Sequence, residues 1–123
     1  MWLTPDLYRL LGSLLDDGRL PDTARRKLLS ALAYFAAPYQ VLRSDEHGAE
    51  GYLDQVYVSL EVIRRLRDRE LPEWLIEDHW EGEGDICQIA ESDLPILRGR
   101  LGAEAVEALH RYLALEPADV PTG

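Results

Sequence analysis

Five residues whose side chains can ligate a metal ion fall within ten consecutive positions of the sequence. They are Asp45, Glu46, His47, Glu50 and Asp54. Four carboxylates and one imidazole form a donor set suited to Mn, Mg or Zn, so metal binding or metal-dependent hydrolysis is a candidate function. Their spacing matches neither the H-E-x-x-H motif nor a calcium-binding loop. The favoured interpretation is therefore a solvated loop in which Gly48 and Gly51 form turns.

A second candidate site is the stretch 77–93, which contains seven acidic residues and no basic one. Such a run is usually a solvated face. Two tryptophans flank or interrupt it, however, and tryptophan is enriched at the centre of protein interfaces. The residues expected to contact a partner are Trp74, Trp80, Glu81, Glu83 and Asp85. The sequence thus predicts a surface that binds a protein with a basic face.

His79 and Cys87 raise the possibility of nucleophilic chemistry, because a thiolate beside an imidazole is an activated nucleophile. The acidic residues around Cys87 favour a raised thiol pKa instead, which opposes thiolate formation. The sequence contains no G-x-S-x-G motif, Gly-rich phosphate loop or CxxC pair. Cys87 is therefore expected to be a buried structural residue, and the sequence does not indicate an enzyme.

Helices must position these residues, because apolar side chains recur at helical spacing and no alternating strand pattern competes. Proline and glycine mark the boundaries. The expected helices cover about 4–18, 21–37 and 52–71, a short segment through Trp74, one or two helices within 85–100 interrupted near Pro95, and a last amphipathic segment through Val106 and Leu113. The apolar stripe of the second helix is expected to contain Leu28, Leu29, Leu32 and Phe35.

The length of 123 residues suits one domain, and the apolar fraction of 46% is that of a globular protein. We predict an all-α fold, a single compact domain of five or six helices around a central hairpin formed by the second and third helices. The domain is expected to span 1–116, and 117–123, which contains Pro117 and Pro121, is expected to be a flexible tail.

The net charge of −10 argues against direct binding to nucleic acid, which requires Lys and Arg to neutralise phosphates. The N-terminal residues do not resemble a signal peptide, no apolar run is long enough to span a membrane, and a single cysteine allows no intrachain disulfide. A cytoplasmic protein is expected. The basic segments RRKLL and RRLRDRE, set against the acidic C-terminal part, also suggest a homo-oligomer.

The centre of the chain resembles the YkvA domain, a bacterial family of uncharacterised function. The resemblance covers about residues 21–66 and rests on Tyr34, Phe35 and Pro38, followed by Gly51, Tyr52, Leu53 and Asp54. Where the family tends to carry acidic residues, this chain has Gln40, Ser44 and Gln55. The resemblance therefore implies an all-helical fold more strongly than an activity.

Together these observations favour a protein-binding or accessory module. The alternatives are a metal-binding or metal-dependent hydrolase domain at residues 45–54, and an acidic mimic of nucleic acid that blocks a basic groove. A divalent metal ion is the one cofactor suggested.

Overall fold

In the computed structural model, the described residues are 3–36 and 53–114. They form six helices and no strand, which confirms the prediction of an all-helical fold. The helices are α1 (Leu3–Leu15), α2 (Asp22–Ala36), α4 (Leu53–Arg69), α5 (Glu73–His79), α6 (Ile86–Leu101) and α7 (Ala103–Ala114). None of these six is both long and apolar enough to cross a membrane. The predicted tail 117–123 and the loop 38–51 lie outside the described residues.

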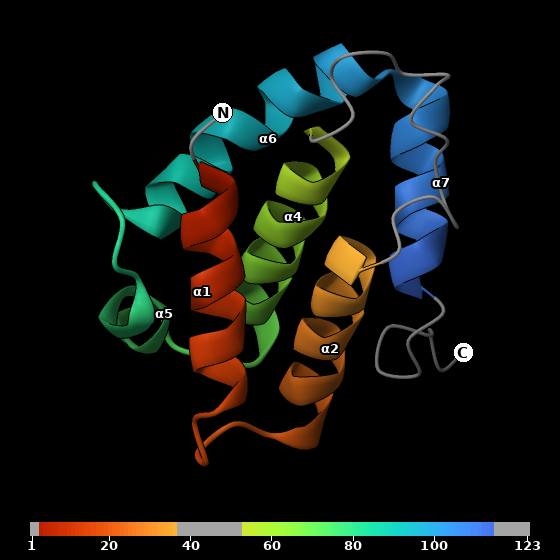
Figure 1. Cartoon of the computed structure of the whole chain (residues 1–123). Coiled ribbons are helices and arrows are strands. Elements are labelled where there is room, and N and C mark those ends of the chain that lie inside the picture. The colour runs from red at the N-terminus through yellow and green to blue at the C-terminus, as the bar shows by residue number, and fades with distance from the viewer. Residues whose placement is uncertain (1–2, 37–52, 115–123) are drawn as a thin grey trace.

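The helix α4 is the centre of the molecule (Figure 1). It packs against α1 and α2 on one side, and against α5 and α6 elsewhere. Apolar side chains around most of its circumference are buried, among them Val56, Leu60 and Ile63. A helix that is apolar on most sides must be covered on most sides, because exposed apolar surface costs free energy in water. The structure therefore places α4 where the sequence pattern predicted a buried helix.

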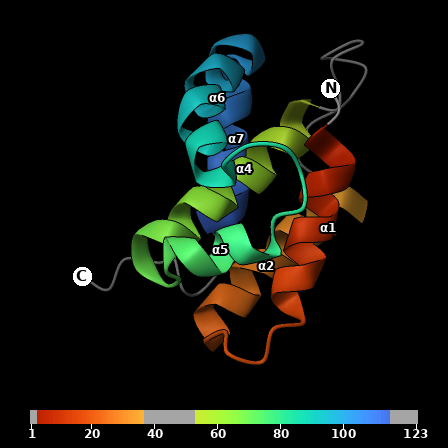
Figure 2. The same ribbon diagram turned by 90° about the vertical axis from the view of Figure 1, so that its left-hand side faces the viewer.

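Leucines at helical spacing form the buried face of α1. Leu7, Leu10, Leu11 and Leu14 are all fully buried, and α5 packs against the same helix (Figure 2). The helix ends at Leu15, earlier than the expected Gly18, because the N–H of Asp17 bonds to the carbonyl of Leu14 in a tighter turn.

Two features of the helices differ from the sequence prediction. α6 continues through Pro95, which is exposed, so the carbonyl that loses its hydrogen bond can be hydrated. Leu29 was expected in the buried stripe of α2 but is 53% exposed. The buried stripe instead runs through Ala24, Leu28 and Ala31, and Leu29 lies about 100° around the helix from Leu28.

The core also contains a buried charge. The side chain of Glu61 in α4 is 0% exposed, and its Oε2 accepts hydrogen bonds from Arg64 at 2.5 Å and Arg65 at 2.9 Å. Arg98 in α6 forms an ion pair with Oε1 at 3.7 Å. Burial alone would raise the pKa of Glu61, but the bonds from Arg64 and Arg65 hold that pKa below its ordinary value. Glu61 is therefore ionised at neutral pH.

The same group of side chains extends to α7. The guanidinium Nε of Arg98 donates to the hydroxyl of Tyr57 at 3.3 Å, and that hydroxyl lies 2.6 Å from Nε2 of His110. Elsewhere, the hydroxyl of Tyr112 donates to the backbone carbonyl of Ser30 in α2 at 2.7 Å. Polar contacts thus fix α7 against both α4 and α2.

We expect Glu61→Gln to lower the free energy of unfolding at pH 7 by about 3 kcal/mol, because it leaves three guanidinium groups without their shared carboxylate. Because the pKa of Glu61 is lowered in the folded protein, its contribution is present above the unfolded pKa and is lost as the pH falls through the folded pKa. The difference between the two proteins should therefore shrink below pH about 4. Urea denaturation at pH 7 and pH 3 measures both effects.

Glu107→Gln is the matched control, because Glu107 pairs with Arg111 on the exposed face of α7. It should change stability by no more than about 0.5 kcal/mol. An equal, small effect of both substitutions would contradict a structural role for the buried carboxylate.

Candidate functional site

The predicted metal cluster is only partly within the described residues. Asp45, Glu46, His47 and Glu50 lie outside them, so the cluster stays a prediction. Asp54 is described, in the first turn of α4, where a carboxylate is favoured by the helix dipole. It is buried and accepts a hydrogen bond from the hydroxyl of Tyr34 at 2.5 Å. This bond joins two of the residues on which the YkvA resemblance rests, and it gives Asp54 a structural role between α2 and α4.

The predicted partner-binding residues lie on α5 and the loop between α5 and α6. Trp74 is 62% exposed, and Glu81, Glu83 and Asp85 are exposed as well. Trp80 differs, because it is 9% exposed and belongs to the hydrophobic core. The exposed part of the predicted surface is therefore Trp74 with the three acids.

Trp80 holds the loop between α5 and α6 in place. Its ring lies directly over Gly82, where a Cβ atom would come within 2.3 Å of the indole. Its Nε1 donates to the backbone carbonyl of Glu83 at 3.4 Å. Only glycine fits at position 82, so the loop that carries Glu81 and Glu83 is tied to the core.

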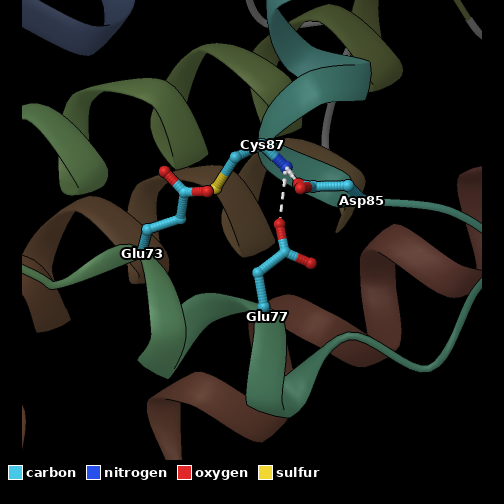
Figure 3. A group of neighbouring side chains, drawn as sticks. All are labelled: Glu73, Glu77, Asp85 and Cys87. Carbon is cyan, nitrogen blue, oxygen red and sulfur yellow. Dashed lines mark hydrogen bonds between the residues drawn. The ribbon is translucent and has the colours of Figure 1, made fainter.

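The first turn of α6 is held by two carboxylates (Figure 3). Asp85 is the N-cap, and its Oδ1 accepts from the N–H groups of Cys87 at 3.0 Å and Gln88 at 3.2 Å. Glu77, at the opposite side of this turn, accepts from the N–H groups of Ile86 at 3.3 Å and Cys87 at 3.0 Å. These bonds satisfy the donors that a helix N-terminus leaves without partners.

The two capping carboxylates also interact with each other. Burial, followed by the hydrogen bond with Asp85, raises the pKa of Glu77. The bond from Glu77, followed by that from the Gln88 N–H, lowers the pKa of Asp85. The pair therefore titrates as one unit, with Glu77 the first of the two to take up a proton.

Cys87 is buried at the start of α6, as the sequence predicted. Burial and the nearby charges of Glu77 and Glu73 raise its thiol pKa to about 12. The cysteine is therefore a thiol at neutral pH and is not an activated nucleophile. His79 is engaged elsewhere, with Ser13 and Asp17 on the side of α1.

The structure brings together a donor set that the sequence did not predict. One ligand atom from each of Glu73, Glu77, Asp85 and Cys87 lies within 4.8 Å of the others (Figure 3). Carboxylate oxygens and a thiolate are ligands that Zn²⁺ accepts. The signal available in the sequence was the i, i+4 spacing of Glu73 and Glu77, which places both on one face of α5.

Most of the basic residues expected to form a basic surface make ion pairs or hydrogen bonds within the chain. Lys27 forms an ion pair with Glu70 at 2.8 Å, Arg67 pairs with Glu91 at 3.0 Å, and Arg25 donates to the backbone carbonyl of Leu15 at 2.7 Å. These contacts leave less positive charge for self-association than the sequence suggested. The homo-oligomer stays a prediction.

Comparisons with known proteins identify a distant relative and no family. No family model matches the chain, so the YkvA resemblance stays a prediction, and no solved structure matches it. The uncharacterized protein ORF9 of Methanothermobacter thermautotrophicus is 28% identical over 100 residues, which cover 81% of this chain and 68% of that protein. The name of that relative states no function.

We expect Asp85→Ala to destabilise the protein, because alanine cannot accept the hydrogen bonds of an N-cap. Asp85→Ser should lose less, since a serine hydroxyl caps a helix nearly as well. Thermal denaturation of the two variants measures the difference. Equal destabilisation by alanine and serine would show that Asp85 contributes through its charge and not through capping.

Proposed function

We propose that this protein is a small interaction or accessory module that binds a protein with a basic face. The proposed binding surface, here called the acidic surface, consists of Trp74, Glu81, Glu83 and Asp85. The observation that carries the proposal is the exposure of Trp74, which presents a large aromatic ring to solvent within an acidic segment of the sequence. Tryptophan in such a setting is the kind of residue that dominates binding energy at interfaces.

Charge supports a basic partner. Among the residues that the structure describes, Glu81 and Glu83 form no ion pair, whereas many acids elsewhere are paired with arginine. Acids without an internal partner keep their full field in solvent, which steers a cationic surface toward them. Arg19 lies over the Trp74 ring, with its guanidinium carbon 5.7 Å from the ring centroid. A guanidinium group of a basic partner would make the same type of contact with the exposed part of this indole.

The surface is also held in a fixed shape. Trp80 ties the loop to the core, and Asp85 is bonded to the first turn of α6. A surface that is already ordered loses little conformational entropy when a partner binds. These features suit binding through a preformed surface.

We expect Trp74→Ala and the pair Glu81→Gln with Glu83→Gln each to weaken capture of the partner by about 10-fold or more, because they remove the aromatic anchor or the steering charge. The measurement is quantitative pull-down from lysate of the native host, followed by mass spectrometry. Substitution of Asp85 is left out, because it would disturb the cap of α6.

The matched control is Glu104→Gln with Glu107→Gln, which makes the same change of charge on α7. Figure 1 shows α7 and α5 on opposite sides of α4. A protein captured equally by all variants would contradict the proposal. If the captured protein binds nucleic acid and added DNA displaces it, the acidic surface lies in the groove where that protein binds nucleic acid. That result would favour the alternative of an acidic mimic of nucleic acid.

A second candidate function is divalent-metal binding, favoured by the four donor atoms of Glu73, Glu77, Asp85 and Cys87. Binding there would require Cys87 to lose its proton, which a metal ion promotes. It would also require Glu77 to exchange part of its bonding to the backbone of α6 for the metal. The donor set fits Zn²⁺ better than Mg²⁺, because it includes sulfur.

We expect Zn²⁺ added to metal-stripped protein to raise the melting temperature, because a ligand that binds the folded state stabilises it. Glu73→Gln should abolish the rise, and this variant leaves both capping carboxylates of α6 in place. No rise in the unaltered protein would contradict metal binding. A rise that survives Glu73→Gln but is lost in His47→Gln would assign the metal to residues 45–54 instead.

A further inference from the structure

A serine, a histidine and an aspartate are joined by hydrogen bonds between α1 and α5. The Oγ of Ser13 lies 2.6 Å from Nδ1 of His79, and Nε2 of His79 lies 2.8 Å from Oδ2 of Asp17. Ser13 and Asp17 are four residues apart in the sequence, whereas His79 is 66 residues from Ser13. The arrangement is therefore visible only in the folded protein.

Asp17 is held as an anion. The backbone N–H and Nε of Arg19 both donate to its Oδ1, and Nη2 of Arg19 donates to Oδ2 at 2.8 Å. These bonds, together with the one from His79, hold the pKa of Asp17 far below its ordinary value. A carboxylate can only accept hydrogen bonds, so Nε2 of His79 carries a proton.

The proton on Nε2 decides the role of the other nitrogen. When the imidazole is neutral, one nitrogen donates and the other accepts, so Nδ1 of His79 then presents its lone pair to Ser13. The serine hydroxyl then donates to Nδ1. A nucleophile bonded to a base that a third group orients is the signature of an activated nucleophile. Serine proteases use the same logic with the two ring nitrogens exchanged.

We propose that Ser13 is an activated nucleophile, with His79 as its general base and Asp17 as the residue that orients His79. The substrate class is carboxylic esters with a good leaving group, such as aryl esters. Ser13 and His79 are both partly exposed, so neither residue is closed off from solvent. The exposed indole of Trp74 belongs to the same surface, because Arg19 both bonds Asp17 and lies over the Trp74 ring.

The reaction has two steps. Ser13 Oγ forms a bond to the carbonyl carbon, its proton moves to Nδ1 of His79, and the bond to the leaving oxygen breaks as that oxygen takes the proton from His79. Water then attacks the acyl-serine, gives a proton to His79, and releases the carboxylic acid while Ser13 regains its proton.

The surroundings of Ser13 favour acylation of the serine over rapid turnover of the ester. The last turn of α1 presents carbonyl oxygens and not N–H groups, so it offers no oxyanion hole of the usual backbone type. We therefore expect the activated serine to show itself by covalent labelling more clearly than by fast hydrolysis.

The test is labelling of the whole protein with a fluorophosphonate, in which Ser13 Oγ forms a bond to phosphorus as fluoride leaves. Peptide mass spectrometry measures the rate at Ser13 and at Ser92, an exposed serine on α6 that serves as the internal control. We expect labelling of Ser13 to be about 100-fold faster than that of Ser92, the size of effect that general-base catalysis provides. His79→Gln should abolish the difference.

A second pair of variants guards against loss of folding in His79→Gln. Asp17→Asn keeps the imidazole but removes the carboxylate that fixes its tautomer, and should slow labelling of Ser13 at least 10-fold. Asp16→Asn changes the exposed neighbour and should leave the rate unchanged. Labelling of Ser13 no faster than Ser92, or unaffected by both His79→Gln and Asp17→Asn, would overturn the proposal and leave the three residues as a structural link between α1 and α5.

Discussion

The buried carboxylate of Glu61 is the constraint on which the packing of this protein depends. A charge on the central helix α4 has to be compensated before that helix can be covered on all sides. Arg64 and Arg65 compensate it from the same helix, and Arg98 does so from α6. Because Arg98 also bonds Tyr57, which contacts His110, one buried charge fixes how α6 and α7 lie against α4.

Two further polar contacts define how α2 lies along α4. Tyr34 donates to Asp54 near one end of the helix pair, and Lys27 pairs with Glu70 near the other. Apolar packing alone tolerates sliding of one helix along another, because it has no direction. A buried polar group left without its partner costs free energy, so such contacts select one register. The ion pair of Lys27 also places a positive charge inside the molecule. The acids on α5 and its loop then determine the charge of the surface.

The helices could be predicted from the sequence because their signals are local. Leucine spacing located α1, and the apolar residues around α4 identified it as the central helix. The predictions that were wrong depended on tertiary packing, which the local sequence pattern does not report. The exposure of Leu29 depends on which face of α2 meets α4, and the continuity of α6 depends on Pro95 facing solvent. Trp80 lies in a segment whose acidic composition is typical of a surface, yet the loop folds its ring into the core over Gly82.

The candidate sites show the same difference between local sequence signals and contacts that form only in the folded protein. The spacing of Glu81, Glu83 and Asp85 made the acidic surface visible in the sequence, whereas the bonds of His79 to Ser13 and Asp17 join residues more than sixty positions apart. The same bonds explain how α5, a helix of seven residues, can be ordered at all. So short a helix is unstable alone in water. His79 ties it to α1 and Glu77 ties it to α6, while Leu75 and Ile76 enter the core. A segment anchored in this way from three directions has its remaining face fixed toward solvent, and that face carries Trp74.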